Sequence, residues 1–443
     1  MGTTNQSLTK KVINNFDNLS TKYTPDPLVI AIILSVLVFF WSAIFTGSLQ
    51  QPLQAWDNGF WKLLNFTLQM SMILLGGYLV ATAPYVNKLI ISQAKKIKTP
   101  QQAIIITTLL SCATSWLNWG FGLVASAIFA MEVGKQLKTV NYRLLVASSY
   151  SGFILWHGGL SGSIPLLLNS ENNFSFHLIG KIVPLSETIF SSLNLILLLT
   201  VTICLLLVNS WLNKWSLSEE IHLQVETEID MPVKINSPAD KLNHSYLIVL
   251  IAFILGITAL ILNSYKEGFN ADLNNVNYIL FFLALLLQKN VSSFMNSVNK
   301  GAKKLGPIIV QYPFYAAIMA ILTDTGLAKE ISQVFINLSS EKTLPFFTFL
   351  SAGLINILVP SGGGQWAVQG PIVIPAALEL NASLTPTILA VAWGDAWTNL
   401  LQPFWALPLL AIANLKIKDI LGFCLLNLIA TGVVISLLLW LLA

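Results

Sequence analysis

The residues best suited to binding a small anion lie in one glycine-rich segment, PSGGGQWAVQGP, at positions 360–371. Pro360 is expected to end a helix, and the three glycines let the backbone turn and approach a ligand closely. The half-helix that follows offers unpaired N–H groups and the positive end of a helix dipole, which favour a carboxylate. A flexible loop between two ordinary helices is the alternative. The segment predicts substrate-binding roles for Ser361, Gly362, Gly363, Gly364 and Gln365.

A second polar segment, GDAWTNLLQP at 394–403, interrupts another apolar stretch. It contains Asp395, an ionisable residue of the kind that is costly inside a membrane and usually functional there. Polar residues three to seven positions later share much of its helical face. Their oxygens suit a sodium ion, whereas the carboxylate alone can take up and release a proton. We assign ion coupling to Asp395 and Gln402 and substrate binding to Thr398 and Asn399. A structural Asp395, satisfied by a partner or capping an unwound turn, is the alternative.

The first half of the chain has a comparable break, SSYSGFILWHGG, at 148–159. His157 can donate a hydrogen bond to a carboxylate or titrate with a coupled proton, and a buried structural histidine is the equal alternative. We predict that His157 contributes to substrate binding and that Ser149 and Ser151 contribute to ion coupling. Asn118, within the segment TSWLNWG, is a further candidate ligand for the ion or substrate, and a simple turn residue at the hairpin tip is the equal alternative. The residues considered together for a sodium ion are Asn118, Asp395, Thr398 and Asn399.

These polar segments lie in a chain whose composition is that of a membrane protein. Of its 443 residues, 55% are apolar and only 10% are charged, and the mean hydropathy is +0.70. A soluble domain carries about 25% charged residues, so a soluble enzyme is excluded. The four histidines and three cysteines show no catalytic or metal-binding spacing. The balance of 24 basic against 20 acidic residues gives no basic run suited to nucleic acid. We therefore expect no enzyme activity, no cofactor and no nucleic-acid partner.

An all-helical polytopic fold follows from the length of the apolar stretches, since a spanning helix needs about 20 mostly apolar residues. Two stretches, 103–137 and 343–380, are too long for one span and have polar, Gly- or Pro-containing centres. We interpret them as re-entrant hairpins. The nine predicted spans are 27–47, 66–87, 141–168, 187–211, 246–263, 274–289, 307–325, 384–412 and 418–442.

The lysines and arginines set the predicted orientation, because loops rich in these residues stay in the cytoplasm. Basic residues precede and follow the first hairpin, so both of its ends are expected in the cytoplasm. A second hairpin that opens outward leaves 19 basic residues in cytoplasmic segments and 5 in external ones. This split places the N-terminus inside and the C-terminus outside.

The order of elements recurs in the two halves: a span, a hairpin, a broken span and a final span. Because the hairpins are predicted to open to opposite faces, the halves are expected to be inverted repeats, an arrangement common among secondary transporters. A charge-rich segment joins them as a solvated connector. The predicted organisation is a cytoplasmic N-terminus (1–26), a first repeat (27–211, with hairpin 103–137 and broken helix 141–168), a cytoplasmic linker (212–245) and a second repeat (246–443, with hairpin 343–380 and broken helix 384–412).

Two motifs carry a family resemblance. The run PSGGGQWAVQGP followed by GDAWTNLLQPFW resembles the signature region of the bacterial short-chain fatty acid transporters, which carry acetoacetate and butyrate. Chain length, span pattern and SWLNWG also match, so the resemblance covers essentially the whole chain. It implies a short monocarboxylate substrate. The wider ion-transporter superfamily is similar in its paired hairpins and broken helices, and it implies homodimers that move a transport domain.

Together, these features predict a secondary active transporter in the bacterial cytoplasmic (inner) membrane. It would import short-chain fatty acid anions by symport with a proton or sodium, with a hairpin-bearing bundle moving against a scaffold. An ion-coupled carrier of larger or dicarboxylate anions is the alternative, although the shortage of intramembrane Lys and Arg argues against two carboxylates. A membrane-embedded enzyme would need a convincing nucleophile–base pair or metal cluster, which the sequence does not show. A channel is a third alternative, and saturable uptake with counterflow would exclude it.

Overall fold

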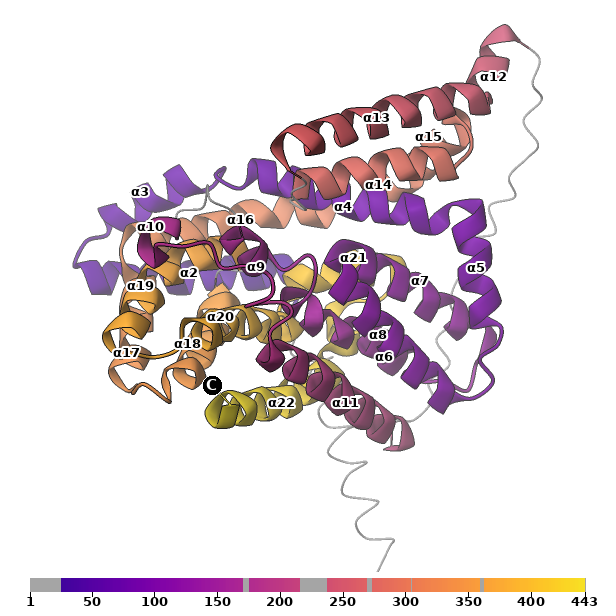
Figure 1. Cartoon of the computed structure of the whole chain (residues 1–443). Coiled ribbons are helices and arrows are strands. Elements are labelled where there is room, and N and C mark those ends of the chain that lie inside the picture. The colour runs from indigo at the N-terminus through magenta and orange to yellow at the C-terminus, as the bar shows by residue number, and fades with distance from the viewer. Residues whose placement is uncertain are drawn as a thin grey trace, which may run out of the picture.

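The computed structural model describes residues 25–169, 175–215, 237–268, 273–303, 305–358 and 362–442. Within these residues the chain is entirely helical (Figure 1). The predicted N-terminal segment falls largely outside them, as does most of the predicted linker, of which the structure describes only the end of α11 and the short helix α12 (Pro238–Asn243).

Four helices in the described part of the chain are long and apolar enough to cross a bilayer. They are α2 (Pro27–Thr46), α11 (Ser192–Trp215), α13 (Tyr246–Glu267) and α22 (Ile417–Leu442). Their apolar residues face outward in large numbers, as expected for helices whose solvent is lipid. Four of the predicted spans therefore have a single helix of full length.

One further predicted span is a bent pair of helices. Helix α4 (Leu64–Thr82) ends just before Pro84, which begins α5 (Pro84–Ala94), and the two axes differ by 72°. Proline at the first helical position cannot extend the preceding helix, because it has no N–H to donate. The sequence analysis treated 66–87 as one span and missed this break.

The first hairpin consists of α6 (Pro100–Leu117) and α7 (Trp119–Gln136), which pack against each other. Thr99 caps the start of α6, and Asn118 alone separates the two helices. The following predicted span is indeed broken, into α8 (Tyr142–Ser151), the 3₁₀ helix η1 (Gly152–Gly158) and α9 (Ser163–Leu168). A short helix, α10 (Phe176–Ile179), precedes α11.

The second half contains the same kinds of element in the same order. Its hairpin consists of α18 (Leu344–Leu358) and α19 (Gly362–Glu379), and its broken span of α20 (Leu384–Thr398), η2 (Asn399–Leu401) and α21 (Pro403–Ala413). Helix α16 (Gly306–Asp324) precedes the hairpin and α22 follows the broken span. The inverted relation between the halves stays a prediction.

The remaining helices lie around this centre. Figure 1 shows α13, α14 (Leu273–Leu287) and α15 (Val291–Ala302) as an outer layer beside α4. Three amphipathic helices, α3 (Gln50–Gly59), α15 and α17 (Leu327–Asn337), lie beside the spans and were not predicted. The largest apolar core lies among α6, α7, α8, η1, α20, α21 and α22. Both broken spans therefore lie in the best-packed part of the protein.

Candidate functional site

The two broken spans meet at a buried histidine–carboxylate pair. His157 Nδ1, in η1, lies 2.7 Å from Asp395 Oδ2, in α20, and both side chains are fully buried. Among the described residues, Asp395 is the only buried carboxylate, and no lysine or arginine is buried. The two halves of the chain thus share one ionisable pair, which is the strongest functional signal in the fold because an ionisable group buried at membrane depth is expensive.

The hydrogen bonds of His157 determine which ring nitrogen carries the proton. The backbone N–H of Ile164 donates to Nε2 at 3.2 Å, and the Ser163 hydroxyl lies 3.0 Å from the same atom. An amide N–H can only donate, so Nε2 must be the unprotonated nitrogen and Nδ1–H must donate to Asp395. The imidazole is therefore neutral here, and an ionised Asp395 gives the pair one net negative charge. The remaining carboxylate oxygen, Oδ1, has no hydrogen-bond partner.

Helix α19 begins directly against this pair. A Cβ atom added to Gly362 would lie 2.4 Å from Ser163 Oγ, 2.6 Å from His157 Cε1 and 3.0 Å from Nε2. Only glycine fits at such a distance. The next residue differs, because a Cβ on Gly363 would meet no atom within 4 Å. The start of α19 therefore touches the histidine through Gly362 and has open space at Gly363.

Asn356, in α18, organises the polar end of α20. Its amide nitrogen lies 2.7 Å from the Asp395 carbonyl oxygen, 2.9 Å from Thr398 Oγ1 and 2.8 Å from Asn399 Oδ1. The carbonyl of Asn356 accepts a hydrogen bond from Gln402 Nε2. Thr398 Oγ1 in turn donates to the carbonyl of Gly353 at 2.9 Å. These bonds hold the end of α20 where the α-helix gives way to η2.

Several buried atoms of this cluster lack partners. They are Asp395 Oδ1, Asn356 Oδ1, Gln402 Oε1 and Asn399 Nδ2. A buried polar atom that forms no hydrogen bond costs about 1–3 kcal/mol. Three oxygens and one N–H group are thus free to receive an ion, a proton or a polar ligand. No group of three or more His, Cys, Asp or Glu suited to a metal ion occurs in the described residues.

Aromatic rings enclose the other side of His157. The Trp156 ring stacks on the imidazole with centroids 4.1 Å apart and planes 17° apart. Trp119, from the first hairpin, and Trp405, from α21, contact each other edge to face at 5.3 Å and both pack on Trp156. The buried Trp156 Nε1 has no partner. This wall is apolar except for the indole N–H groups of its tryptophans.

Two further contacts hold the halves together. Tyr150 donates its hydroxyl to the Asn399 carbonyl at 2.6 Å. Asn194, in α11, donates to the Gly158 carbonyl at 2.9 Å and accepts from the Trp393 indole at 2.9 Å. Residues of η1 and α20 are therefore anchored on both sides of the His157–Asp395 pair.

The other predicted site residues of the first half form a separate network. Ser149 donates to Ser126 Oγ at 2.8 Å, and its carbonyl accepts from Ser111. Ser151 accepts from Asn209 Nδ2 at 3.0 Å and donates to the Ser148 carbonyl. None of these bonds reaches Asp395. The structure thus joins Ser149 and Ser151 to neighbouring helices rather than to the pair.

The remaining predicted ligands occupy varied positions. Asn118 caps α7, accepting from the Phe121 N–H at 3.0 Å. Gln365 is fully buried and donates to the Ala352 carbonyl and to Gln369, while its Oε1 has no partner. Ser361 lies outside the described residues. Of the predicted set, the structure brings His157, Gly362, Asp395, Thr398, Asn399 and Gln402 into one connected region.

Sequence analysis missed Asn356, Asn194, Tyr150 and Ser163. Asn356 and Asn194 are each flanked by apolar residues within a helix, in LINIL and SLNLI. A lone amide at membrane depth needs a partner, so this pattern could have marked both residues. Ser163 carries no such signal, because a serine hydroxyl in a helix commonly bonds to its own backbone. Tyr150 carries none either, because its aromatic ring suits an apolar core and its hydroxyl usually finds a partner there.

Two cavities open on different parts of the surface, and neither is lined by His157 or Asp395. One, of about 550 Å³, gathers residues near 25, 306 and 416, all in segments assigned to the cytoplasm by the lysine distribution. The other, of about 420 Å³, gathers residues 181–187 and 377–388, which were assigned to the outside. Each cavity thus lies among segments that were assigned to the same side of the membrane. The orientation of the protein in the membrane stays a prediction.

Comparison with known proteins gives one consistent result. The sequence matches the family described as short chain fatty acid transporter over residues 8–442. A relative in Escherichia coli (strain K12), described as "Putative short-chain fatty acid transporter", is 37% identical over 431 residues, which are 94% of this chain and 95% of that protein. A relative in Haemophilus influenzae with the same description is 37% identical over 424 residues, 93% and 95% of the two chains.

Among solved structures, the chain is similar to the YdaH transporter of Alcanivorax borkumensis. The sequences are 14% identical, the TM-score is 0.43, and the match covers 93% of this chain and 98% of that one. A likeness of this degree carries no argument about the site.

Proposed function

Because the chain belongs to the short-chain fatty acid transporter family, we propose that it imports short-chain fatty acid anions such as acetoacetate and butyrate. Its family makes it a multi-pass membrane transporter and not an enzyme. The proposed membrane is the bacterial cytoplasmic membrane, with the N-terminus inside and the C-terminus outside. The proposed process is secondary active transport, coupled to a proton or sodium.

The observation that carries this proposal is the buried His157–Asp395 pair between the two broken spans. An anionic substrate entering this region meets no buried lysine or arginine among the described residues. Neutral donors would hold its single carboxylate: the first N–H groups of α19, Trp156 Nε1 and Asn399 Nδ2. Two carboxylates would each need a counter-charge, which makes a carrier of dicarboxylate or larger anions the second candidate.

A proton supplies the simplest coupling. With His157 neutral, the pair carries the charge of an ionised Asp395, which repels a substrate carboxylate. Protonation at Asp395 Oδ1 removes that charge and breaks none of the observed hydrogen bonds, because Oδ1 has no partner. Substrate and proton then favour each other's binding by the same free energy, as linkage requires. This reciprocal dependence is what symport needs.

Sodium is the second coupling ion to consider. The unpartnered oxygens of Asp395, Asn356 and Gln402 are of the type that bind hard cations. Thr398 and Asn399 already direct their oxygens toward the Asn356 amide. Sodium binding here would require Asn356 to rotate, whereas proton binding requires no rearrangement. We therefore favour the proton.

Alternating access would follow from movement of the hairpin-bearing helices against a scaffold of the other spans. The open space at Gly363 makes the start of α19 the proposed contact for the substrate carboxylate, while Gly362 joins that helix to the pair. A homodimer is proposed from the family resemblance alone.

The test is uptake of radiolabelled butyrate or acetoacetate into proteoliposomes with an imposed pH or sodium gradient. We expect an inward proton gradient to drive accumulation, and counterflow to exclude a channel. Accumulation driven only by sodium would transfer the coupling role to the Asn356 cluster. No gradient-stimulated uptake of any C2 to C6 acid would reject the substrate class, and uptake of succinate instead would favour the second candidate.

A further inference from the structure

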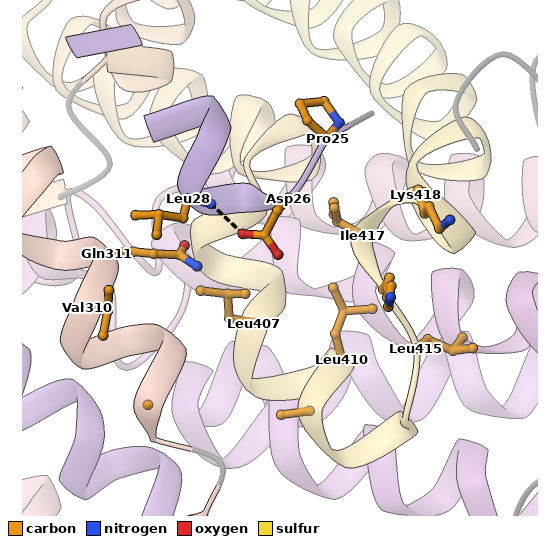
Figure 2. A pocket seen from close by; sticks show the side chains of 13 residues that line it. Pro25, Asp26, Leu28, Val310, Gln311, Leu407, Leu410, Leu415, Ile417 and Lys418 are labelled. Atoms are coloured by element: carbon orange, nitrogen blue, oxygen red, sulfur yellow. Dashed lines mark hydrogen bonds between the residues drawn. The ribbon is translucent and has the colours of Figure 1, made fainter. Parts of the chain in front are cut away.

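The larger of the two cavities lies away from the His157–Asp395 pair and belongs to no step described so far. It has a volume of about 550 Å³ and lies between α2, α16, α21 and the start of α22 (Figure 2). Its wall is mainly apolar, and its size is in the range of sites for small organic ligands. Its lining includes Leu28, Val310, Leu407, Leu410, Leu415 and Ile417.

Three long helices begin at this cavity. Pro25, Asp26 and Leu28 belong to the start of α2, Gly306 is the first residue of α16, and Ile417 is the first residue of α22. A helix N-terminus carries partial positive charge and unpaired N–H groups. Asp26 caps α2 by accepting from the Leu28 N–H at 2.9 Å, but no side chain caps α16. The cavity thus has a positive end.

Two lysines add full charges to that end. Lys416 and Lys418 line the cavity beside the start of α22. The nearest acid in the sequence, Asp419, accepts from the Lys416 backbone N–H at 2.8 Å and lies 3.7 Å from Arg143. Asp26 is the only acidic residue that lines the cavity. The charged residues of the lining are thus two lysines and one aspartate, a composition that favours an anion.

A buried amide at the cavity wall lacks a partner. Gln311, in α16, is only 4% exposed, and its Oε1 forms no hydrogen bond. Figure 2 shows its amide near Leu28 and Asp26, at the side of the cavity formed by α2 and α16. Gln69, in α4, instead donates to Asn274 at 2.8 Å. The unpaired oxygen is an acceptor, so this side of the cavity has room for a group that donates a hydrogen bond.

The cavity also lies on a seam between two groups of helices. Helix α16 packs mainly on α2 and α3 and only lightly on α21, whereas α22 packs on α11, α8 and α20. A molecule in the cavity would contact both groups at once. It would therefore resist any movement of α21 and α22 relative to α2 and α16.

We propose that this cavity is a second, regulatory site for a fatty acid whose acyl chain is longer than that of the transported substrates. Its carboxylate binds Lys416, Lys418 and the starts of α16 and α22, and its chain lies along Leu407 and Leu410. Binding holds the two helix groups together and slows transport. The binding site stands on the cavity alone, and its effect on transport rests on the proposed function.

Binding is tested without transport, using a decanoic acid that carries a diazirine on its chain. The full-length protein is reconstituted in zwitterionic lipid, irradiated and digested, and the cross-linked peptides are identified by mass spectrometry. We expect cross-links in α21 near Leu407 and Leu410. Excess decanoate should compete, and equimolar butyrate should not. Lys416→Gln with Lys418→Gln should lower the yield about tenfold or more, and the control Lys95→Gln with Lys96→Gln should not.

A second variant separates filling the cavity from unfolding. Val310 is 52% exposed and lines the cavity, so Val310→Trp adds bulk there at little cost to the core. Val310→Trp should abolish the cross-links. In proteoliposomes loaded with decanoate, the proposed inhibition of butyrate uptake should also be relieved, while butyrate uptake itself continues. Cross-links unaffected by both variants, or equal competition by butyrate, would overturn the proposal. So would loss of cross-linking on adding phosphatidylglycerol, which would identify a phospholipid as the occupant.

Discussion

The two broken spans differ in how they satisfy their polar side chains. In the first half, α8 uses hydroxyls: Ser149 bonds to Ser126, and Ser151 bonds to Asn209. In the second half, the end of α20 uses a carboxylate and amides, with Asp395 and Asn356 at the centre. The unpartnered atoms around α8 include hydroxyls such as Ser148 Oγ, whereas those around the end of α20 include carboxylate and amide atoms.

This difference leads us to propose separate roles for the two broken spans, although both are built from a helix, a 3₁₀ turn and a second helix. Hydroxyls can bond to their own helix, so we propose that the first break serves mainly for packing and presents His157. Carboxylate and amide groups bind protons, ions and anions far better, so the second break is the proposed binding region. The pair links them, because His157 comes from one break and Asp395 from the other. Substitutions matched between the breaks test this division.

The largest effect is expected for Asp395→Asn. The amide oxygen can still accept from His157 Nδ1, so the fold is retained, but the side chain no longer carries a titratable charge. Proton-driven accumulation of butyrate should fall by about tenfold or more, while exchange of labelled for unlabelled butyrate continues. Both are measured in the same proteoliposomes, and unchanged accumulation would remove Asp395 from the mechanism.

A matched pair of buried amides gives the next effect. Asn356→Ala and Asn209→Ala each remove a fully buried side chain that donates more than one hydrogen bond. Each should destabilise the protein by about 1–3 kcal/mol, seen as a lower melting temperature. Only Asn356→Ala should also raise the KM for butyrate, since Asn356 holds the cluster at Asp395. If Asn356→Ala and Asn209→Ala changed the KM equally, the two broken spans would not differ in their roles.

Adjacent glycines at the start of α19 provide a finer test. Gly363→Ala places a methyl group in open space, so the melting temperature should not change. The methyl group should push a substrate carboxylate from the helix N-terminus and raise the KM by about fivefold. Gly362→Ala should instead lower the melting temperature, because its Cβ would overlap Ser163 and His157. An unchanged KM for Gly363→Ala would place the carboxylate elsewhere.

The smallest effect is expected for Ser149→Ala. It removes one hydrogen bond between α8 and α7, worth about 1 kcal/mol. Butyrate accumulation by Ser149→Ala, measured in proteoliposomes at different proton and sodium gradients, should match that of the unchanged protein. A shift in ion dependence would support the sequence-based assignment of Ser149 to ion coupling, and it would show that the first break binds the ion as well.

Much of the fold could be predicted from patterns of single residues. Apolar length located α2, α13 and α22 to within a few residues, and polar centres located both hairpins and both broken spans. The break at Pro84 was missed because its flanks are as apolar as a continuous span. Apolar length did not identify the amphipathic α3 and α17, because they are shorter than a span and carry many polar residues.

The candidate site was predictable only in part, since composition identifies polar residues in apolar surroundings but not their partners. The sequence alone determined that Asp395 and the 360–371 segment are exceptional, because their cost in a membrane requires compensation. Only the tertiary structure decided that Asp395 pairs with a histidine 238 positions earlier. It also decided that Ile164 fixes the neutral form of that histidine. Hydrogen bonds depend on distances of about 3 Å between segments far apart in the chain, and spacing along one chain does not encode them.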